Sequence, residues 1–96
     1  MKINVKTLKF NAKPELIFFV EEKVSKLSRF DDKIISAEVT LFSEDAKIPE
    51  NKVCEIRLIV PGYDDFVKKT ATTFEEAVLN CVDTLQTILH RKKERA

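Results

Sequence analysis

The side chains with the clearest potential for chemistry in this chain are cationic, and many of them lie near its end. Within the last six residues there are four bases and one acid. Because lysine and arginine bind phosphate groups, a local cluster of this kind can hold a polyanion even when the total charge is near zero. The candidate RNA-binding residues are Lys23, Lys26, Arg29, Lys68, Lys69, His90, Arg91, Lys92, Lys93 and Arg95.

Other types of chemistry have little support in the sequence. His90 is the only histidine, and it has neither a nucleophile context nor a second histidine with which to share a metal. The paired carboxylates Asp31-Asp32 and Asp64-Asp65 lie beside aromatic residues at predicted turns, where we expect them to stay solvated rather than act as general acids or bases. One glycine is too few for a glycine-rich phosphate loop. We therefore expect no enzyme activity, no metal, no cofactor and no small-molecule substrate.

The composition is typical of one small domain. The chain has 96 residues, of which 44% are hydrophobic and 34% charged, so there is material for one core and not two. No apolar run is long enough to cross a membrane, and the first residues do not resemble a secretion signal, so we expect a cytoplasmic protein with no membrane partner. Cys54 and Cys81 lie in apolar patterns without metal-ligand spacing, which predicts buried, reduced thiols.

Charge is unevenly distributed along the chain, although the formal net charge is only +1. Between Glu44 and Asp65 there are six acids and three bases, whereas from Lys68 to the end there are six bases and four acids. This distribution predicts a basic pole formed by the C-terminal segment.

The elements that must position these residues begin with a strand over 2–10, disrupted near Thr7, and a helix from Pro14 to about residue 28. We expect Lys23, Lys26 and Arg29 to form a basic ridge along one edge of the buried face of this helix. Of Phe18 and Phe19, at least one should lie outside the core. The predicted buried face consists of Leu16, Ile17, Val20, Val24 and Leu27.

Three strands are predicted next, over 34–43, 52–60 and 66–71, with a polar loop before the second. Pro61-Gly62 is typical of a type II turn and therefore of a hairpin. The side chains expected to face the core are Ile35, Ala37, Val39, Leu41, Cys54, Ile56, Leu58 and Val60. Those expected on the opposite, hydrated face include Ser36, Glu38, Thr40, Val53, Glu55, Arg57 and Ile59.

The pattern of the last segment, 73–95, predicts a helix that continues beyond the end of its apolar face. Thr73 and Glu76 form a capping-box pattern at its start. Its apolar stripe continues to Leu89, after which the same face would carry Lys92 and Arg95. Cations are also favoured at any helix C-terminus and keep small domains soluble, so this basic end is compatible with a purely structural role as well as with phosphate binding.

The order of elements predicts an α+β fold with two layers. The topology is β-α-β-β-β-α, with a four-stranded sheet and two helices on one of its faces. Three consecutive strands with short connections favour antiparallel pairing.

In its order of elements and in two stretches of residues, the sequence resembles the ribosome hibernation promoting factors, also called ribosome-associated inhibitor or sigma-54 modulation proteins. The segment from Val20 to Phe30 is similar to the family's K-x-x-K-L-x-R-F motif, and 73–95 is similar to its closing helix with a basic end. The start of that helix departs from the family's Asp-x-Tyr-Ala-Ala-Ile-Asp-like pattern, because Phe74 to Leu79 has no tyrosine and no aspartate. The resemblance covers essentially the whole chain and implies a fold related to double-stranded-RNA-binding domains.

The resemblance also implies a function. Residues 1–96 would form a single ribosome-binding domain of the short form, since the long forms carry a second domain that pairs ribosomes. Such a protein sits on the small ribosomal subunit and blocks translation by occupying the mRNA and tRNA channel of idle, stationary-phase ribosomes. The resemblance implies that rRNA is contacted at the positions of Lys23, Lys26, Arg29, Arg91, Lys92 and Lys93. We expect it to be a monomer when free. The alternatives are a general double-stranded-RNA-binding module and a protein-binding regulator that uses the outer sheet face.

Overall fold

The computed structural model describes residues 1–95, and the side chains of residues 1–93. The elements are β1 (Lys2–Thr7), α1 (Pro14–Ser25), the 3₁₀ helix η1 (Lys26–Arg29), β2 (Ser36–Ser43), β3 (Lys52–Val60), β4 (Tyr63–Ala71) and α2 (Phe74–Arg95). Their order is the predicted β-α-β-β-β-α, and the predicted α+β class is confirmed.

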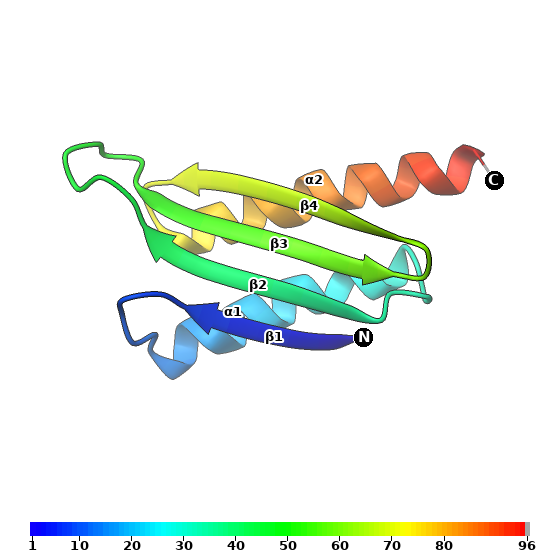
Figure 1. Ribbon diagram of the computed structural model, residues 1–96, viewed down its shortest axis with the longest axis horizontal. Coiled ribbons are helices and arrows are strands. Elements are labelled where there is room, and N and C mark those ends of the chain that lie inside the picture. Colours follow the sequence, from blue (N-terminus) through cyan, green and yellow to red (C-terminus); the bar gives the residue numbers. More distant parts are fainter. Residues whose placement is uncertain (96) are drawn as a thin grey trace.

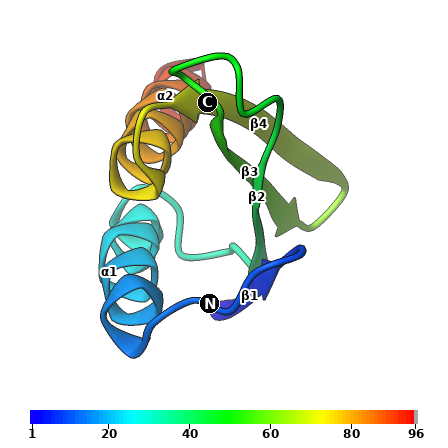
Figure 2. The same ribbon diagram turned by 90° about the vertical axis from the view of Figure 1, so that its left-hand side faces the viewer.

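The four strands form one mixed sheet in the order β1-β2-β3-β4. β1 runs parallel to β2, and the other neighbours are antiparallel. A parallel pair needs a crossover connection, which here is α1 with η1, whereas antiparallel neighbours need only short loops. Both helices cover the same face of this sheet (Figure 1, Figure 2). The predicted two-layer arrangement is therefore confirmed.

The core lies between the sheet and the helices. It combines Val20, Val24 and Leu27 of the first helical segment with the apolar stripe of α2 and the inward side chains of β2, β3 and β4. Burial of each valine, leucine or isoleucine side chain stabilises the folded state by roughly 1.5–3 kcal/mol. Neither helix could bury its apolar face without the sheet. The α2 members are Ala77, Val78, Cys81, Val82, Leu85 and Leu89.

Both cysteines are buried and free, as predicted. The Cys81 thiol donates a hydrogen bond of 3.2 Å to the Cys54 carbonyl oxygen. Contact with the Cys81 side chain, followed by burial, raises the pKa of the Cys54 thiol far above its ordinary value. The thiol form of Cys54 is therefore the stable one, and this pair belongs to the core.

The first strand and the first helix end earlier than predicted. β1 stops at Thr7, and Lys9 adopts a left-handed backbone with φ of 64°. α1 ends at Ser25 and continues as a 3₁₀ turn that carries Lys26 to Arg29. Phe18 is 72% exposed, which agrees with the expectation that one of the two phenylalanines lies outside the core.

Two predictions about the sheet faces were wrong. Ile35 was expected in the core but is 57% exposed, because β2 begins only at Ser36 and strand alternation does not apply before it. The outer face is also drier than expected. Ser36 is buried there, and Val53, opposite Phe42 and Thr70, is fully buried outside the main core.

The hairpin between β3 and β4 is tighter than predicted. Gly62 has φ of 90°, a conformation that a type II turn requires at this position and that glycine adopts without steric cost. Val60 and Tyr63 pair directly across the turn. β4 consequently begins at Tyr63 rather than at Phe66, which adds Tyr63 and Asp65 to the β4 side chains on the helix-covered face.

The predicted helix cap of α2 is present in part. The Glu76 N–H donates to the Thr73 hydroxyl oxygen at 3.1 Å. The Glu76 carboxylate accepts from the hydroxyl of Thr72, at 3.2 Å, rather than from the Thr73 backbone. Glu75 and Glu76 lie in the first turn, where negative charge stabilises the helix.

Candidate nucleic-acid interface

The basic end of the molecule is formed by three segments that are far apart in sequence. The C-terminal ends of α1 with η1 and of α2 lie at the same end of the sheet as the β3–β4 turn, and α2 extends beyond that turn (Figure 1). The C-terminus of a helix carries partial negative charge, so cations are stabilised there. This geometry agrees with the prediction that the last helix continues as a basic segment beyond its last core residue, Leu89.

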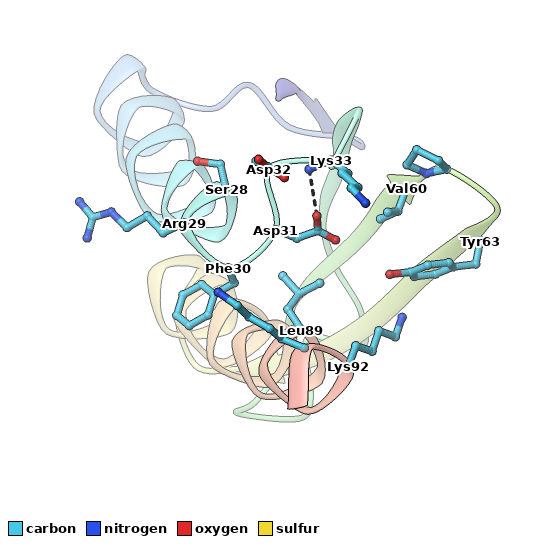
Figure 3. Close-up of a pocket in the computed structure, with 12 residues that line it drawn as sticks. Ser28, Arg29, Phe30, Asp31, Asp32, Lys33, Val60, Tyr63, Leu89 and Lys92 are labelled. Atoms are coloured by element: carbon cyan, nitrogen blue, oxygen red, sulfur yellow. Dashed lines mark hydrogen bonds between the residues drawn. The ribbon is translucent and has the colours of Figure 1, made fainter. Parts of the chain in front are cut away.

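A cavity of about 670 Å³ lies between these segments (Figure 3). It is lined by Ser28, Arg29, Phe30, Asp31, Asp32, Lys33, Val60, Pro61, Tyr63, Leu89, Lys92 and Lys93. The basic ridge of the first helical segment and the basic end of α2 therefore meet at one place. Their sequence separation gives no indication of this proximity.

Lys92 is held by partners within the molecule. Its Nζ donates to both carboxylate oxygens of Asp65, at 2.7 and 2.8 Å, and lies 3.7 Å from the centre of the Tyr63 ring. The side chain of Asp65 is 11% exposed and that of Lys92 is 38% exposed. Because charge-assisted hydrogen bonds to a partly buried carboxylate are strong, Lys92 connects α2 to β4 and its charge is largely neutralised. Figure 3 shows Lys92 and Tyr63 side by side.

Three of the predicted RNA-binding cations at this end are exposed and unpaired within the described residues. They are Arg29, Arg91 and Lys93. Arg29 points outward, away from Tyr63 and Lys92 (Figure 3). These three side chains can reach phosphate groups without breaking an existing pair.

Acidic residues also lie at this end. Asp31 accepts a hydrogen bond of 2.9 Å from the Lys33 N–H and closes the turn after η1. The antiparallel hairpin places Asp64 and Asp65 here too, so the acidic stretch of the sequence does not form a separate pole in space. The exposed cations on the rim of the cavity are therefore the side chains here that no neighbouring acid of the described residues pairs with.

The remaining ridge residues lie further back along the first helical segment. Lys23 is partly shielded, since its Nζ lies 3.4 Å from the Glu22 carboxylate and 5.5 Å from the centre of the Phe19 ring. Lys26 is half-buried in η1. Of the predicted ridge, Arg29 is the residue that lines the cavity.

Lys68 and Lys69 do not act together. Lys68 lies on the outer face of the sheet, where it pairs with the Glu44 carboxylate at 3.0 Å, and this partner raises the pKa of Lys68. Lys69 is opposite Cys54 and lies half-buried on the helix-covered face. Neither residue lines the cavity.

His90 and Arg95 both belong to the last turns of α2. His90 is exposed in the last turns of α2 and interacts with neighbouring groups. The side chain of Arg95 lies outside the described residues, although its backbone closes α2.

Sequence reasoning missed Tyr63, Asp65 and Lys33 as parts of this site. Strand alternation places Tyr63 and Asp65 on the helix-covered face once β4 is known to start directly after the glycine turn. The Pro61-Gly62 pair indicates a tight turn after which a strand could begin at once, but the strand predicted from Phe66 leaves out Tyr63 and Asp65.

Among the described residues, no group of three or more histidine, cysteine, aspartate or glutamate side chains could hold a metal ion. Within the same part of the chain, no helix combines the length and the apolar character needed to span a bilayer.

A known protein family matches nearly the whole length of this chain. The family model described as sigma 54 modulation protein / S30EA ribosomal protein matches residues 3–96. The chain belongs to this family. The resemblance predicted from the sequence, to the ribosome-associated hibernation factors, is thereby confirmed.

Solved structures agree with the family assignment. The chain is similar to the N-terminal domain of Thermus thermophilus Protein Y, with 25% identity, a TM-score of 0.80 and coverage of 95% of this chain and 98% of that one. It shares its fold with a ribosomal subunit interface protein from Coxiella burnetii, with 18% identity, a TM-score of 0.84 and coverage of 98% and 99%. No curated protein matches the chain significantly.

Proposed function

We propose that this protein is a ribosome hibernation factor that binds the small ribosomal subunit through its rRNA. One observation carries the proposal beyond family membership. Arg29 of η1 and Lys93 of α2, which are far apart in sequence, line the same cavity and stay exposed without ion pairs within the described residues. Structured RNA is held largely through its phosphates and its shape, and exposed cations from two adjacent helices suit that mode of recognition.

The proposed mechanism is occupancy rather than catalysis. The domain, which measures 44 × 24 × 19 Å, would lie in the mRNA and tRNA channel of the subunit and exclude those ligands. Its partner is the small subunit, and its compartment is the cytoplasm, where ribosomes work. The whole chain, residues 1–96, acts as one ribosome-binding domain without a cofactor.

The surroundings of the described cations support different proposed roles for them. Arg29, Arg91 and Lys93 are proposed to contact phosphates directly. Lys92, held by Asp65, positions the end of α2. Lys23 and Lys26 extend the contact along the first helical segment, and Lys69, His90 and Arg95 remain candidates of the same kind.

The test is co-sedimentation with small ribosomal subunits. We expect the double variant Arg91→Glu/Lys93→Glu to migrate free of the subunits while keeping the circular dichroism spectrum and melting temperature of the unaltered protein. The matched control, Lys13→Glu/Lys47→Glu, makes the same change in net charge in the loops at the opposite end of the molecule (Figure 1) and should still co-sediment. Equal binding by both variants would contradict the proposed interface.

A second measurement distinguishes this function from general binding of double-stranded RNA. The small subunit and an unrelated RNA duplex of similar charge are compared at the same salt concentration, because phosphate contacts alone give salt-dependent affinity for any duplex. A hibernation factor should bind the subunit with an affinity at least about tenfold higher than its affinity for the duplex. Equal affinity for the two would identify a general RNA-binding module instead.

A further inference from the structure

The two edges of the sheet differ in their charge patterns. β1 and β4 are the edge strands, and each presents backbone N–H and C=O groups that no neighbouring strand pairs. β1 carries Lys2 and Lys6 on its outer face, so two copies of β1 would oppose like charges. Such a pattern protects an edge against pairing with its own copy.

β4 carries charges of both signs in a self-complementary order. Asp64 and Asp65 precede the central residues Phe66 and Val67, and Lys68 and Lys69 follow them. In an antiparallel pair of two such strands, the acidic half of one strand lies alongside the basic half of the other. A parallel pair would instead place acids beside acids and lysines beside lysines, which is unfavourable.

The side chains of β4 also favour one particular register between the two copies. Asp64, Phe66 and Lys68 lie on the outer face, opposite Ile59, Arg57 and Glu55 of β3. If Phe66 lies opposite Phe66 of a second copy, Asp64 faces Lys68 on both sides of the two-fold axis. On the helix-covered face, the same register places Tyr63 opposite Lys69. Aromatic pairs and opposite charges across strands are the contacts that stabilise sheets.

The present partners of these residues do not oppose such a contact. Asp64 lies 3.7 Å from Arg57, and Lys68 lies 3.0 Å from Glu44, with all four side chains between 42% and 48% exposed. Exposed pairs of this kind contribute little and can exchange. Phe66 is 48% exposed, and Arg57 stacks on its ring at 4.9 Å.

We propose that β4 is a self-association edge that pairs antiparallel with β4 of a second copy of this chain. The two sheets then form one continuous sheet with the helices of both copies on the same face. The contact is independent of the proposed ribosome binding, and it differs from the free monomer expected from the sequence.

The test is a charge-swap series measured by sedimentation equilibrium of the full chain over a range of concentrations up to the millimolar range. Unaltered protein should show a reversible monomer–dimer equilibrium. Lys68→Asp and Asp64→Lys each place like charges opposite one another twice in the dimer, and each should weaken the dimer about tenfold or more. The double variant Asp64→Lys/Lys68→Asp restores the complementary pairs and should recover dimerisation.

Folding and specificity have their own controls. Thermal unfolding of each variant shows that the monomer is intact, and Lys6→Asp on the β1 edge should leave the dimer unchanged. A second readout is oxidation of Phe66→Cys, which should give a symmetric disulfide dimer, whereas Ile59→Cys on the central strand should not. A protein that stays monomeric throughout, or a dimer that is insensitive to both single charge changes, would overturn the proposal.

Discussion

The two basic segments of this chain look alike in sequence and differ in the folded molecule. Along the first helical segment, Lys23 has only a weak neighbouring partner in Glu22, and Arg29 is exposed. At the end of α2, Lys92 is bound by both oxygens of Asp65. A cation counted in the sequence is therefore available for binding only if the fold leaves it without a strongly bound carboxylate partner.

The largest expected effect is on stability and concerns Lys92. Lys92→Glu places a second carboxylate next to Asp65, which is 11% exposed, so we expect it to lower the free energy of unfolding by about 2 kcal/mol or more. Lys93→Glu, one residue further along on the exposed surface, should change it by less than about 0.5 kcal/mol. Urea denaturation followed by circular dichroism measures both values.

A charge swap sharpens this result. Asp65→Lys/Lys92→Asp should recover much of the stability that either single change removes, because the pair is re-formed with opposite polarity. Equal losses for Lys92→Glu and Lys93→Glu would show that the Asp65 contact contributes nothing to stability.

The next effect is on the salt dependence of binding to the small subunit. Replacing an exposed phosphate contact reduces the slope of log affinity against log salt by about one. We expect this for Arg29→Ala and for Lys93→Ala. Lys92→Met, which removes a charge already neutralised by Asp65, should leave the slope nearly unchanged. Identical slopes for Lys92→Met and Lys93→Ala would mean that Lys92 exchanges Asp65 for phosphate on the ribosome.

The smallest effect concerns Lys68, whose pair with Glu44 is exposed, in contrast to that of Lys92. Glu44 raises the pKa of Lys68 in the folded protein above its ordinary value of 10.5. Its contribution to stability is therefore complete below that value and is lost as the pH rises through the higher folded pKa. The small difference in melting temperature between unaltered protein and Lys68→Met should be present at neutral pH and decrease as the pH rises above the ordinary lysine pKa. A difference that does not change with pH would require a cause other than charge.

Much of the fold was predictable because it depends on local patterns. Alternation fixed the bounds of β3, the three- and four-residue period revealed α2, and the Thr73 pattern placed the start of that helix. The errors lie at a strand boundary and at a position whose burial depends on neighbouring strands, where the local pattern does not determine burial. Ile35 precedes the strand it seemed to belong to, and Val53 is buried on the outer face by neighbours on adjacent strands.

The candidate site was predictable in its residue types and not in their partners. The basic segments were visible because several cations recur within a few residues. The pair between Lys92 and Asp65 was not, since it joins residues 27 positions apart through a hairpin whose register depends on one glycine.

The sequence by itself determined the fold class, the two layers, the family and the concentration of cations in two segments, because these follow from periodicity, capping and composition. Only the tertiary structure decided that Arg29 and Lys93 meet at one cavity, that Lys68 and Lys69 point to opposite faces, and that Lys92 is neutralised. The physical reason is that charge availability depends on contacts between distant segments, and those contacts exist only after the sheet register and the helix packing are set.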